Sequence, residues 1–490
     1  MSRYSIANQG DGTDMHLIKD SLFGIVRGPL YGHLGAKADV FMPQVHQLGA
    51  HLVRLFLFWS QLEPERDHFV WDALDTLLAQ LEPHDEVWIT LNASSLWASR
   101  HATNFQPPSP ARDPDEYQRF VTALVSHCQG RISYWQCENE PTNPLLWEGT
   151  AQEYAQHLKI FSQAVKQVDP TARVILAGAV DNFHIPADAE HPDAQTEQAF
   201  FDHLLRESAA YFDIFDLHAY GELYAIPANI LAVRQKMLAL GYKKPIVIGE
   251  YNGPSFFNFA ENLPIMQRLF ESIYANPHRD TLAQAIQSEA IAELYAQMAD
   301  LPPQAQMFME GCSPELEQKR QRINCRELVI RSVLALSAGV CKLFCWNLAN
   351  EKVDPHNMMH LLFDKYKLVD YEKGIFKQPY PAAETFRRMV HILAGLEHIQ
   401  RIEVPEQPDI YLFAVQRKER SPLLISWERR DAFSGEDEPP TPFTWPWPAS
   451  RAQAIDVFGN ELPLKLQAGS LYLSLSATPV FIAAQDESEQ

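Results

Sequence analysis

Residues 134–141 read YWQCENEP, and residues 245–254 read PIVIGEYNGP. Each segment is a short apolar run that stops at a glutamate and meets a proline within four residues, which is typical of a buried strand followed by a break. The break places Glu140 and Glu250 at the carboxyl ends of their strands. If both strands belong to one parallel barrel, the two side chains can face each other across its mouth. Two carboxylates across a cleft, one protonated and one ionised, are the minimal equipment for cleaving a glycosidic bond.

Strand-like and helix-like segments alternate along roughly the first 390 residues, which indicates βα units around a parallel sheet. The number of strands, eight, is that of a closed (β/α)8 TIM barrel. The predicted strands are Phe23–Arg27, Leu52–Trp59, Glu86–Asn92, Ile132–Glu138, Arg173–Val180, Phe212–His218, Pro245–Glu250 and Lys342–Trp346. The predicted helices between and after them are Val40–Leu48, Trp71–Leu81, Pro114–His127, Ala151–Val168, Glu197–Ser208, Ala228–Leu240 and Cys325–Ala338.

Two segments depart from this alternation. Residues 255–322 are too long for a simple connection and are expected to form an excursion at the barrel mouth, with a helix over Thr281–Met298. After a last helix at Pro379–Leu396, period-two runs predict short strands in a small C-terminal β-sandwich, with a proline-rich loop at Glu436–Pro448. The expected domains are therefore residues 1–395, a barrel, and residues 396–490, a sandwich. The sandwich strands are predicted at Ile410–Gln416, Leu423–Trp427, Ala454–Val457, Ser470–Leu475 and Val480–Ala484.

The amino-acid composition argues against several classes of function. A hydrophobic fraction of 46% with 21% charged residues is that of a globular protein rather than a disordered one. The net charge of −21 argues against nucleic acid or an anionic membrane as a partner. The N-terminus has no apolar stretch of a signal peptide, and no run of 18 apolar residues occurs, so we expect a cytoplasmic protein. Six cysteines in apolar contexts are expected to be reduced.

Further motifs end the predicted strands in a fixed order. They are FWSQLEPE at 58–65 with FVWDALD at 69–75, Asn139-Glu140-Pro141, His218-Ala219-Tyr220, Gly249-Glu250-Tyr251 and Trp346. In this order and spacing the chain resembles glycoside hydrolase clan A, the retaining (β/α)8-barrel glycosidases, with families 39, 5 and 42 the most similar. The resemblance implies hydrolysis of β-linked neutral glycosides with no cofactor and no catalytic metal.

The resemblance assigns roles to the two glutamates. Glu140 resembles the general acid/base, which protonates the departing oxygen and then activates water. Glu250 resembles the nucleophile, ionised so that it can attack the anomeric carbon. Asn139 resembles the residue that bonds the sugar 2-hydroxyl, although an asparagine there could merely cap the turn.

Arg54 interrupts the apolar strand Leu52–Trp59, and a charge in a barrel strand is costly unless it is paired. The resemblance implies that Arg54 pairs with Glu250, which would depress the pKa of that carboxyl and keep it ionised. A structural acid elsewhere in the barrel is the alternative partner.

Other positions are candidates for substrate binding. Tyr220 is expected to bond the nucleophile, His218 to line the same subsite and Trp346 to form an apolar floor under the sugar, and each could instead be a core residue. Trp97 and Asn92, after the third strand, are further candidates. Trp59, Trp147 and His33 are candidates on the same footing.

Glu138 departs from the clan pattern, where an aromatic residue often stands. By the two-residue period of a strand it shares a face with Glu140, so it could tune the acid or contact the sugar. It could equally be a member of an ion pair inside the barrel.

Two rival functions use the same sequence features. A non-catalytic carbohydrate-binding barrel is disfavoured because pure binding needs no pair of catalytic carboxylates. A transglycosidase would use the same residues as a hydrolase. Motifs of other chemistries, such as H-E-x-x-H, paired C-x-x-C or G-x-G-x-x-G, do not occur.

Overall fold

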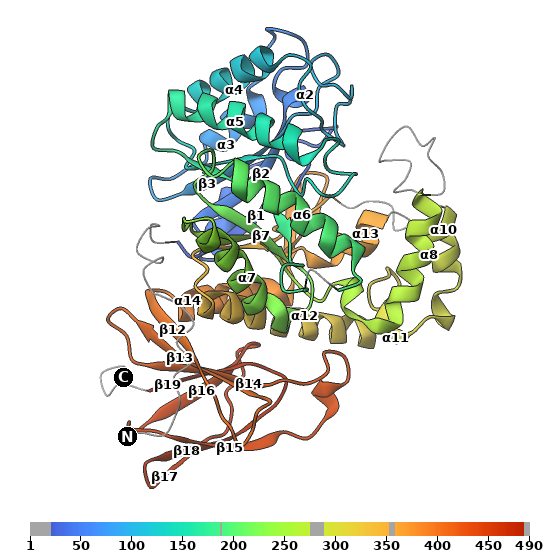
Figure 1. The fold of residues 1–490 in the computed structure, drawn as a ribbon. Helices are drawn as coiled ribbons and strands as arrows, with labels where there is room; N and C mark the ends of the chain where they lie inside the picture. Colours follow the sequence, from blue (N-terminus) through green and yellow to red (C-terminus); the bar gives the residue numbers. More distant parts are fainter. Residues whose placement is uncertain (1–20, 187–188, 275–288, 352–357, 485–490) are drawn as a thin grey trace.

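The computed structural model describes residues 21–186, 189–274, 289–351 and 358–484 (Figure 1). Its larger part is a sheet of parallel strands in the order β5-β4-β3-β2-β1-β9-β8-β7-β6. The strands are β1 (Phe23–Val26), β2 (Leu52–Phe58), β3 (Glu86–Asn92), β4 (Tyr134–Cys137), β5 (Arg173–Ile175), β6 (Ala179–Val180), β7 (Phe215–Ala219), β8 (Ile246–Tyr251) and β9 (Leu343–Trp346).

The sheet closes on itself. β5 and β6 are the two parts of the fifth predicted strand, and Ile175 forms a parallel bridge with Ile214, just before β7. The backbone N–H of Leu176 donates to the carbonyl of Ile214 at 3.0 Å. The predicted (β/α)8 barrel is therefore confirmed. Large side chains, among them Trp88 and Phe344, fill its interior as a packed core.

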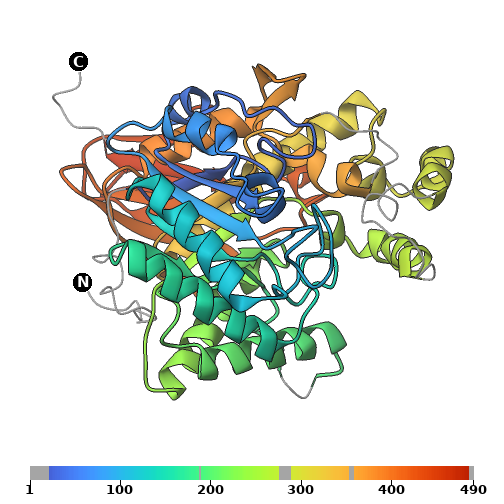
Figure 2. The ribbon, with the colours of Figure 1, turned by 90° about the horizontal axis from the view of Figure 1, so that it is seen from above.

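Helices surround the barrel (Figures 1 and 2). They are α1 (Met42–Gln47), α2 (Trp59–Leu62), α3 (Asp72–Leu78), α4 (Pro114–Cys128), α5 (Ala151–Val168), α6 (Pro192–Glu207), α7 (Ile226–Ala239), α12 (Pro314–Ser337) and α14 (Pro381–Ile392). Local sequence sets several starts: Thr150 and Glu153 form a capping box at α5, and the Asp113 side chain caps α4. Both α6 and α12 begin earlier than expected, each with a proline in its first turn.

The excursion after β8 has a core of its own. It contains α8 (Leu263–Tyr274), α10 (Glu289–Ala296) and α11 (Pro303–Gln306), and α13 (Met358–Phe363) adds to the same cluster. Phe256 and Phe308 pack edge to face in this cluster, with ring centroids 5.3 Å apart. α10 lies within the helix expected at Thr281–Met298, of which residues 281–288 lie outside the described residues. Figure 2 shows α8 and α10 projecting from one side of the barrel.

Two antiparallel sheets form the C-terminal part. One has the order β12-β13-β14-β19-β16 and the other β15-β18-β17. Their bounds are β12 (Leu396–Ile402), β13 (Ile410–Arg417), β14 (Leu423–Glu428), β15 (Thr441–Pro446), β16 (Ala452–Asp456), β17 (Lys465–Gln467), β18 (Ser470–Leu475) and β19 (Val480–Ala484). Leu412 and Ile482 from one sheet share a core with Phe443 and Leu473 from the other, so the β-sandwich is confirmed.

Two sequence expectations were wrong in this region. The proline-rich segment contains strand β15 instead of a continuous loop, and it tolerates prolines because β15 is an edge strand. The last helix ends at Ile392, and Leu396 begins a strand. A hairpin of β10 (Val369–Glu372) and β11 (Ile375–Pro379), not expected from the sequence, lies before α14.

In the described part of the chain, no helix has the length and apolarity that crossing a membrane requires.

Candidate active site

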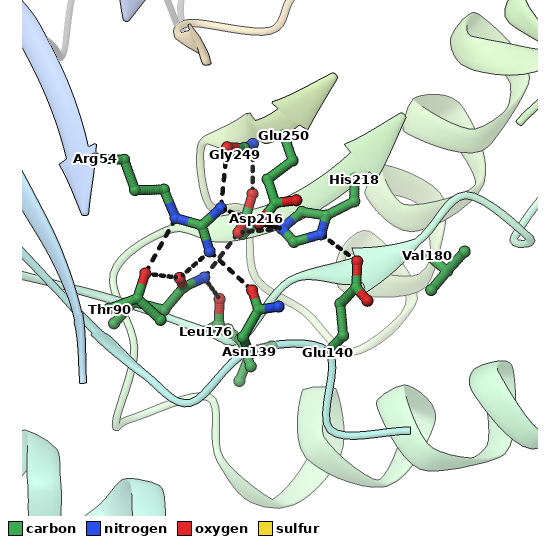
Figure 3. A network of polar contacts seen from close by, with 12 residues as sticks. Arg54, Thr90, Asn139, Glu140, Leu176, Val180, Asp216, His218, Gly249 and Glu250 are labelled. Atoms are coloured by element: carbon green, nitrogen blue, oxygen red, sulfur yellow. Dashed lines mark hydrogen bonds and ion pairs between the residues drawn. The ribbon is translucent and has the colours of Figure 1, made fainter. Parts of the chain in front are cut away.

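The predicted site residues meet at the carboxyl ends of the barrel strands (Figure 3). Arg54 comes from β2, Asn139 and Glu140 follow β4, His218 lies in β7 and Glu250 in β8. One carboxylate oxygen of Glu140, one of Glu250 and a ring nitrogen of His218 all lie within 4.8 Å of one another. The side chain of Glu250 is 6% exposed and that of Glu140 17%. One carboxylate is thus deeply buried, and the other is reached by solvent.

A tight turn after β4 positions Glu140. Glu138 and Glu140 have φ angles of 63° and 39°, in the left-handed region that non-glycine residues rarely adopt. The N–H of Asn143 donates to the Glu140 carbonyl at 3.0 Å and closes the turn. Such conformations cost about 1–3 kcal/mol each and cluster at functional sites.

Arg54 connects several residues of the site through its hydrogen bonds. Its guanidinium is fully buried and donates to Glu250 Oε1 at 2.6 Å, as the resemblance implied. Its other acceptors are Gly249 O at 3.1 Å, Gln136 Oε1 at 2.8 Å, Asn139 Oδ1 at 2.8 Å and Thr90 Oγ1 at 3.0 Å. These bonds use the donors on all three guanidinium nitrogens, so a single cation orients both the nucleophile candidate and the asparagine beside Glu140.

The charge of Arg54 lowers the pKa of Glu250, as expected, but this effect does not bring that pKa below its ordinary value. Burial raises the pKa of Glu250, and the charges of His218 and Arg54 lower it only in part, so that the net direction is upward. Tyr220 donates its hydroxyl to Glu250 Oε2 at 2.9 Å and favours the ionised form as well. Glu250 therefore needs these partners to ionise in its buried position.

His218 bridges Glu140 and a carboxylate that the sequence did not single out. Its Nδ1 lies 2.6 Å from Glu140 Oε1, and its Nε2 lies 3.2 Å from Asp216 Oδ2. Burial lowers the pKa of His218, but the carboxylates of Glu250 and Asp216 raise it to about 10. At neutral pH the ring is an imidazolium, so both nitrogens donate hydrogen bonds.

Asp216 lies beneath the site with no exposed surface. It accepts the backbone N–H of Gly249 at 2.6 Å and the side-chain amide of Gln136 at 2.7 Å, in addition to His218. A Cβ at Gly249 would lie 2.4 Å from Asp216 Oδ1, so the glycine of the G-E-Y motif admits this carboxylate. That glycine, with an aspartate inside an apolar strand, was the sequence signal for Asp216.

Glu197, also missed, is a third buried carboxyl group behind the Glu140 loop. It lies in α6, accepts the N–H of Val180 at 2.7 Å and bonds the hydroxyl of Thr142. Burial raises the pKa of Glu197 to about 8. It links the end of β6 to the turn that carries Glu140.

Two further predicted residues lie on the inner face of the barrel. Trp346 ends β9 and packs edge to face against Phe56, with 7% of its surface exposed. Asn92 ends β3 on the same strand face as Thr90, and neither its amide nitrogen nor its amide oxygen has a partner among the described residues. A buried amide without partners is suited to bonding a substrate hydroxyl.

The other candidate rings are not part of this hydrogen-bonded site. Trp97 donates its indole N–H to Glu63 O at 3.1 Å and packs edge to face against Trp59 in the core outside the barrel. Trp147 is buried against the ring of His157. His33 stacks on Phe58, with its Nε2 2.6 Å from Asn104 O.

Glu138 does not share a face with Glu140, and the strand-period expectation was wrong. β4 ends at Cys137, and the left-handed backbone at Glu138 breaks the period. The fully buried carboxylate bonds Nε2 of His157 on α5 at 3.0 Å and the N–H of Ala93 at 3.0 Å. Glu138 is therefore hydrogen-bonded to a histidine of α5 and does not contact Glu140.

Comparisons with known proteins agree with the geometry. No family model and no curated protein matches the sequence. The structure resembles a family 39 glycoside hydrolase from Bacteroides cellulosilyticus WH2, with a TM-score of 0.62 and 13% identity over 94% of this chain and 80% of that one. It also resembles a glucosidase from Croceicoccus marinus, with a TM-score of 0.56 and 13% identity over 95% and 96% of the two chains. A third similar structure is a family 30 subfamily 8 xylanase from Clostridium acetobutylicum, with a TM-score of 0.53 and 11% identity over 95% of this chain and 97% of that one.

These likenesses identify the class of fold. The chain has the barrel-plus-sandwich fold that these family 39 and family 30 glycoside hydrolases share, so the fold implied by the resemblance in its sequence is confirmed.

Proposed function

We propose that the protein is a retaining glycoside hydrolase that cleaves β-linked neutral glycosides by double displacement. The observation that carries this proposal is the placement of Glu140 and Glu250, because one carboxylate oxygen of each lies within 4.8 Å of the other. Retaining enzymes hold their two carboxyl groups about 5–5.5 Å apart, whereas inverting enzymes need about 6.5–9.5 Å to admit a water molecule. The short separation favours direct attack by one carboxylate on the sugar.

In the first step Glu250 attacks the anomeric carbon and the bond to the leaving oxygen breaks. Glu140 gives its proton to that oxygen, and a covalent glycosyl ester forms on Glu250. In the second step Glu140 takes a proton from water, the water oxygen attacks the anomeric carbon, and Glu250 leaves as a carboxylate. Both steps invert the anomeric centre, so the product retains its configuration.

The surrounding residues support this division of roles. Arg54 and Tyr220 each bond one oxygen of Glu250, which favours the ionised form that a nucleophile needs. His218 bonds Oε1 of Glu140, so the second oxygen of that carboxyl is assigned the transferable proton. Asn139, held by Arg54, presents its amide beside the acid, and Asn92 and Trp346 are assigned to sugar hydroxyls and the apolar ring face.

The proposal is tested with a panel of aryl β-glycosides and the variant Glu140→Ala. Without the proton donor, natural glycosides with poor leaving groups should lose most activity, while aryl glycosides with acidic leaving groups should still form the intermediate. Added azide should restore turnover and give a β-glycosyl azide. Glu148→Ala, which changes a half-exposed glutamate in the same loop, should leave both activities unchanged. Equal loss on both substrate types with no azide product would refute the acid/base assignment.

A further inference from the structure

Two histidines and an aspartate converge on the side of the barrel opposite the active site. His46 lies in α1. His51 directly precedes β2 and Asp85 directly precedes β3, so these two residues lie at the amino ends of their strands. His46 Nε2 lies 2.8 Å and His51 Nδ1 lies 3.1 Å from the same oxygen, Asp85 Oδ1. All three ligand atoms lie within 4.8 Å of one another, and the two ring centroids are 4.9 Å apart.

A second layer of contacts holds this arrangement. The other oxygen of Asp85 accepts the backbone N–H of Glu82 at 2.8 Å, and the Asp85 side chain has no exposed surface. The carboxylate of Glu82 lies 3.8 Å from Nδ1 of His46, on the side of the ring away from Asp85. Carboxylate or backbone partners on the far side of each ligand are the usual support of a protein metal site, because they fix the ligand's orientation and its tautomer.

The cluster is also reachable from solvent. His51 and Asp85 line a cavity of about 1260 Å³ at the amino end of the barrel, and His46 lines a neighbouring one of about 490 Å³. The His51 side chain is 42% exposed and that of His46 20%. An ion can therefore enter, and water can complete its coordination.

We propose that His46 Nε2, His51 Nδ1 and Asp85 Oδ1 bind a divalent transition-metal ion of the zinc type. Imidazole nitrogens and a carboxylate oxygen are donors that Zn²⁺ accepts, with bonds of about 2.0–2.2 Å. Two ligands at that distance in tetrahedral geometry lie about 3.3 Å apart. Two of the three separations, at 2.8 and 3.1 Å, need only a small outward adjustment to reach it, and the third, between the two histidine nitrogens, is within 4.8 Å.

The ion would join the connection between α1 and β2 to the entry of β3, which lies 34 residues beyond His51. Because His51 and Asp85 precede β2 and β3, whereas Glu140 and Glu250 lie at the carboxyl ends of β4 and β8, the ion takes no part in the chemistry at Glu250. An ion that binds the folded chain and not the unfolded one raises thermal stability by mass action.

The test is calorimetric titration of Zn²⁺ alone into the full chain, comparing wild type with His46→Gln and His51→Gln. We expect each substitution to weaken one binding event at least about tenfold and to abolish the rise in Tm that zinc gives the wild type. The matched control is His101→Gln: the His101 side chain is also 42% exposed and also faces a carboxylate, at 3.1 Å, but it pairs with no second histidine among the described residues. This control should bind zinc as the wild type does.

Among the described residues, two other groups of side chains bring ligand atoms equally close, and the test separates them. They are Glu140, His218 and Glu250 at the active site, and Cys137, Glu138 and His157 between the end of β4 and α5. Zinc binding that survives both His46→Gln and His51→Gln but disappears in His218→Gln would assign the ion to the active site and overturn the proposal.

A second measurement uses the unmutated protein. Diethyl pyrocarbonate modifies accessible histidines, and peptide mass spectrometry reports which ones. Zinc should protect His46 and His51 and leave His101 reactive. Equal modification of His51 with and without zinc would overturn the proposal.

Discussion

Replacing Tyr220 by phenylalanine removes the hydroxyl that donates a hydrogen bond to Glu250, the proposed nucleophile. The aromatic ring is kept. The hydroxyl donates to Glu250 Oε2 at 2.9 Å, at a carboxylate that is almost fully buried. A hydrogen bond to a charged group contributes about 1.5–3 kcal/mol. Each step of about 1.36 kcal/mol corresponds to a tenfold change in rate. Loss of this bond from the ionised nucleophile should therefore lower kcat/KM about 10- to 150-fold.

The same variant should change the pH profile. Burial raises the pKa of Glu250, and the hydrogen bond from Tyr220 is one of the contacts that lower it. Without that bond the pKa of Glu250 rises further, so the acid limb of kcat/KM moves to higher pH because the nucleophile must be ionised. The assay is the rate on an aryl glycoside against pH.

Tyr224→Phe is the matched control, because the Tyr224 hydroxyl accepts an indole N–H from Trp427 at 3.1 Å, at the contact between barrel and sandwich. It should leave kcat/KM and its acid limb unchanged. A loss below threefold in Tyr220→Phe, or an acid limb that does not move, would refute the assigned role of Glu250.

Two further predictions concern buried charge. Burial lowers the pKa of His218, and the charge of Asp216 helps to raise it to about 10. Asp216→Asn should therefore lower that pKa, as measured by NMR titration of the ring, and should reduce kcat/KM about tenfold or more. Burial alone would raise the pKa of Glu436, but bonds from Arg322 at 2.7 Å and Arg326 at 2.6 Å lower it to about 2 from 4.5. Glu436→Gln should therefore reduce the free energy of unfolding by about 1–3 kcal/mol at pH 7, and the deficit should vanish as pH falls from 4.5 towards 2, measured by denaturant unfolding.

Elements with a strong local signal were predictable from the sequence. β3 and α5 have the bounds expected for them, because an apolar run flanked by turn residues specifies the first and a capping box starts the second. The meeting of Glu140 and Glu250 followed from the barrel itself, since carboxyl ends of parallel strands share one mouth.

What local patterns could not supply was the register between strands and the breaks in them. Asp216 stands in an apolar strand, and only the packing of β7 beside β8 shows that it lies under Gly249 and His218. The position of Glu138 depends on a left-handed residue after β4, which overrides the alternation of a regular strand. β15 was missed because its prolines are permitted only by its place at the sheet edge.

The central claim, covalent catalysis by Glu250, is tested most directly by trapping the intermediate. A 2-deoxy-2-fluoro-β-glycoside with an acidic aryl leaving group, of the sugar that the panel selects, should form an ester that hydrolyses slowly. Intact-mass and peptide mass spectrometry should then show one fluoroglycosyl group on Glu250, and Glu250→Gln should show none. An adduct on another carboxylate, or hydrolysis that gives a first product of inverted configuration, would contradict the account.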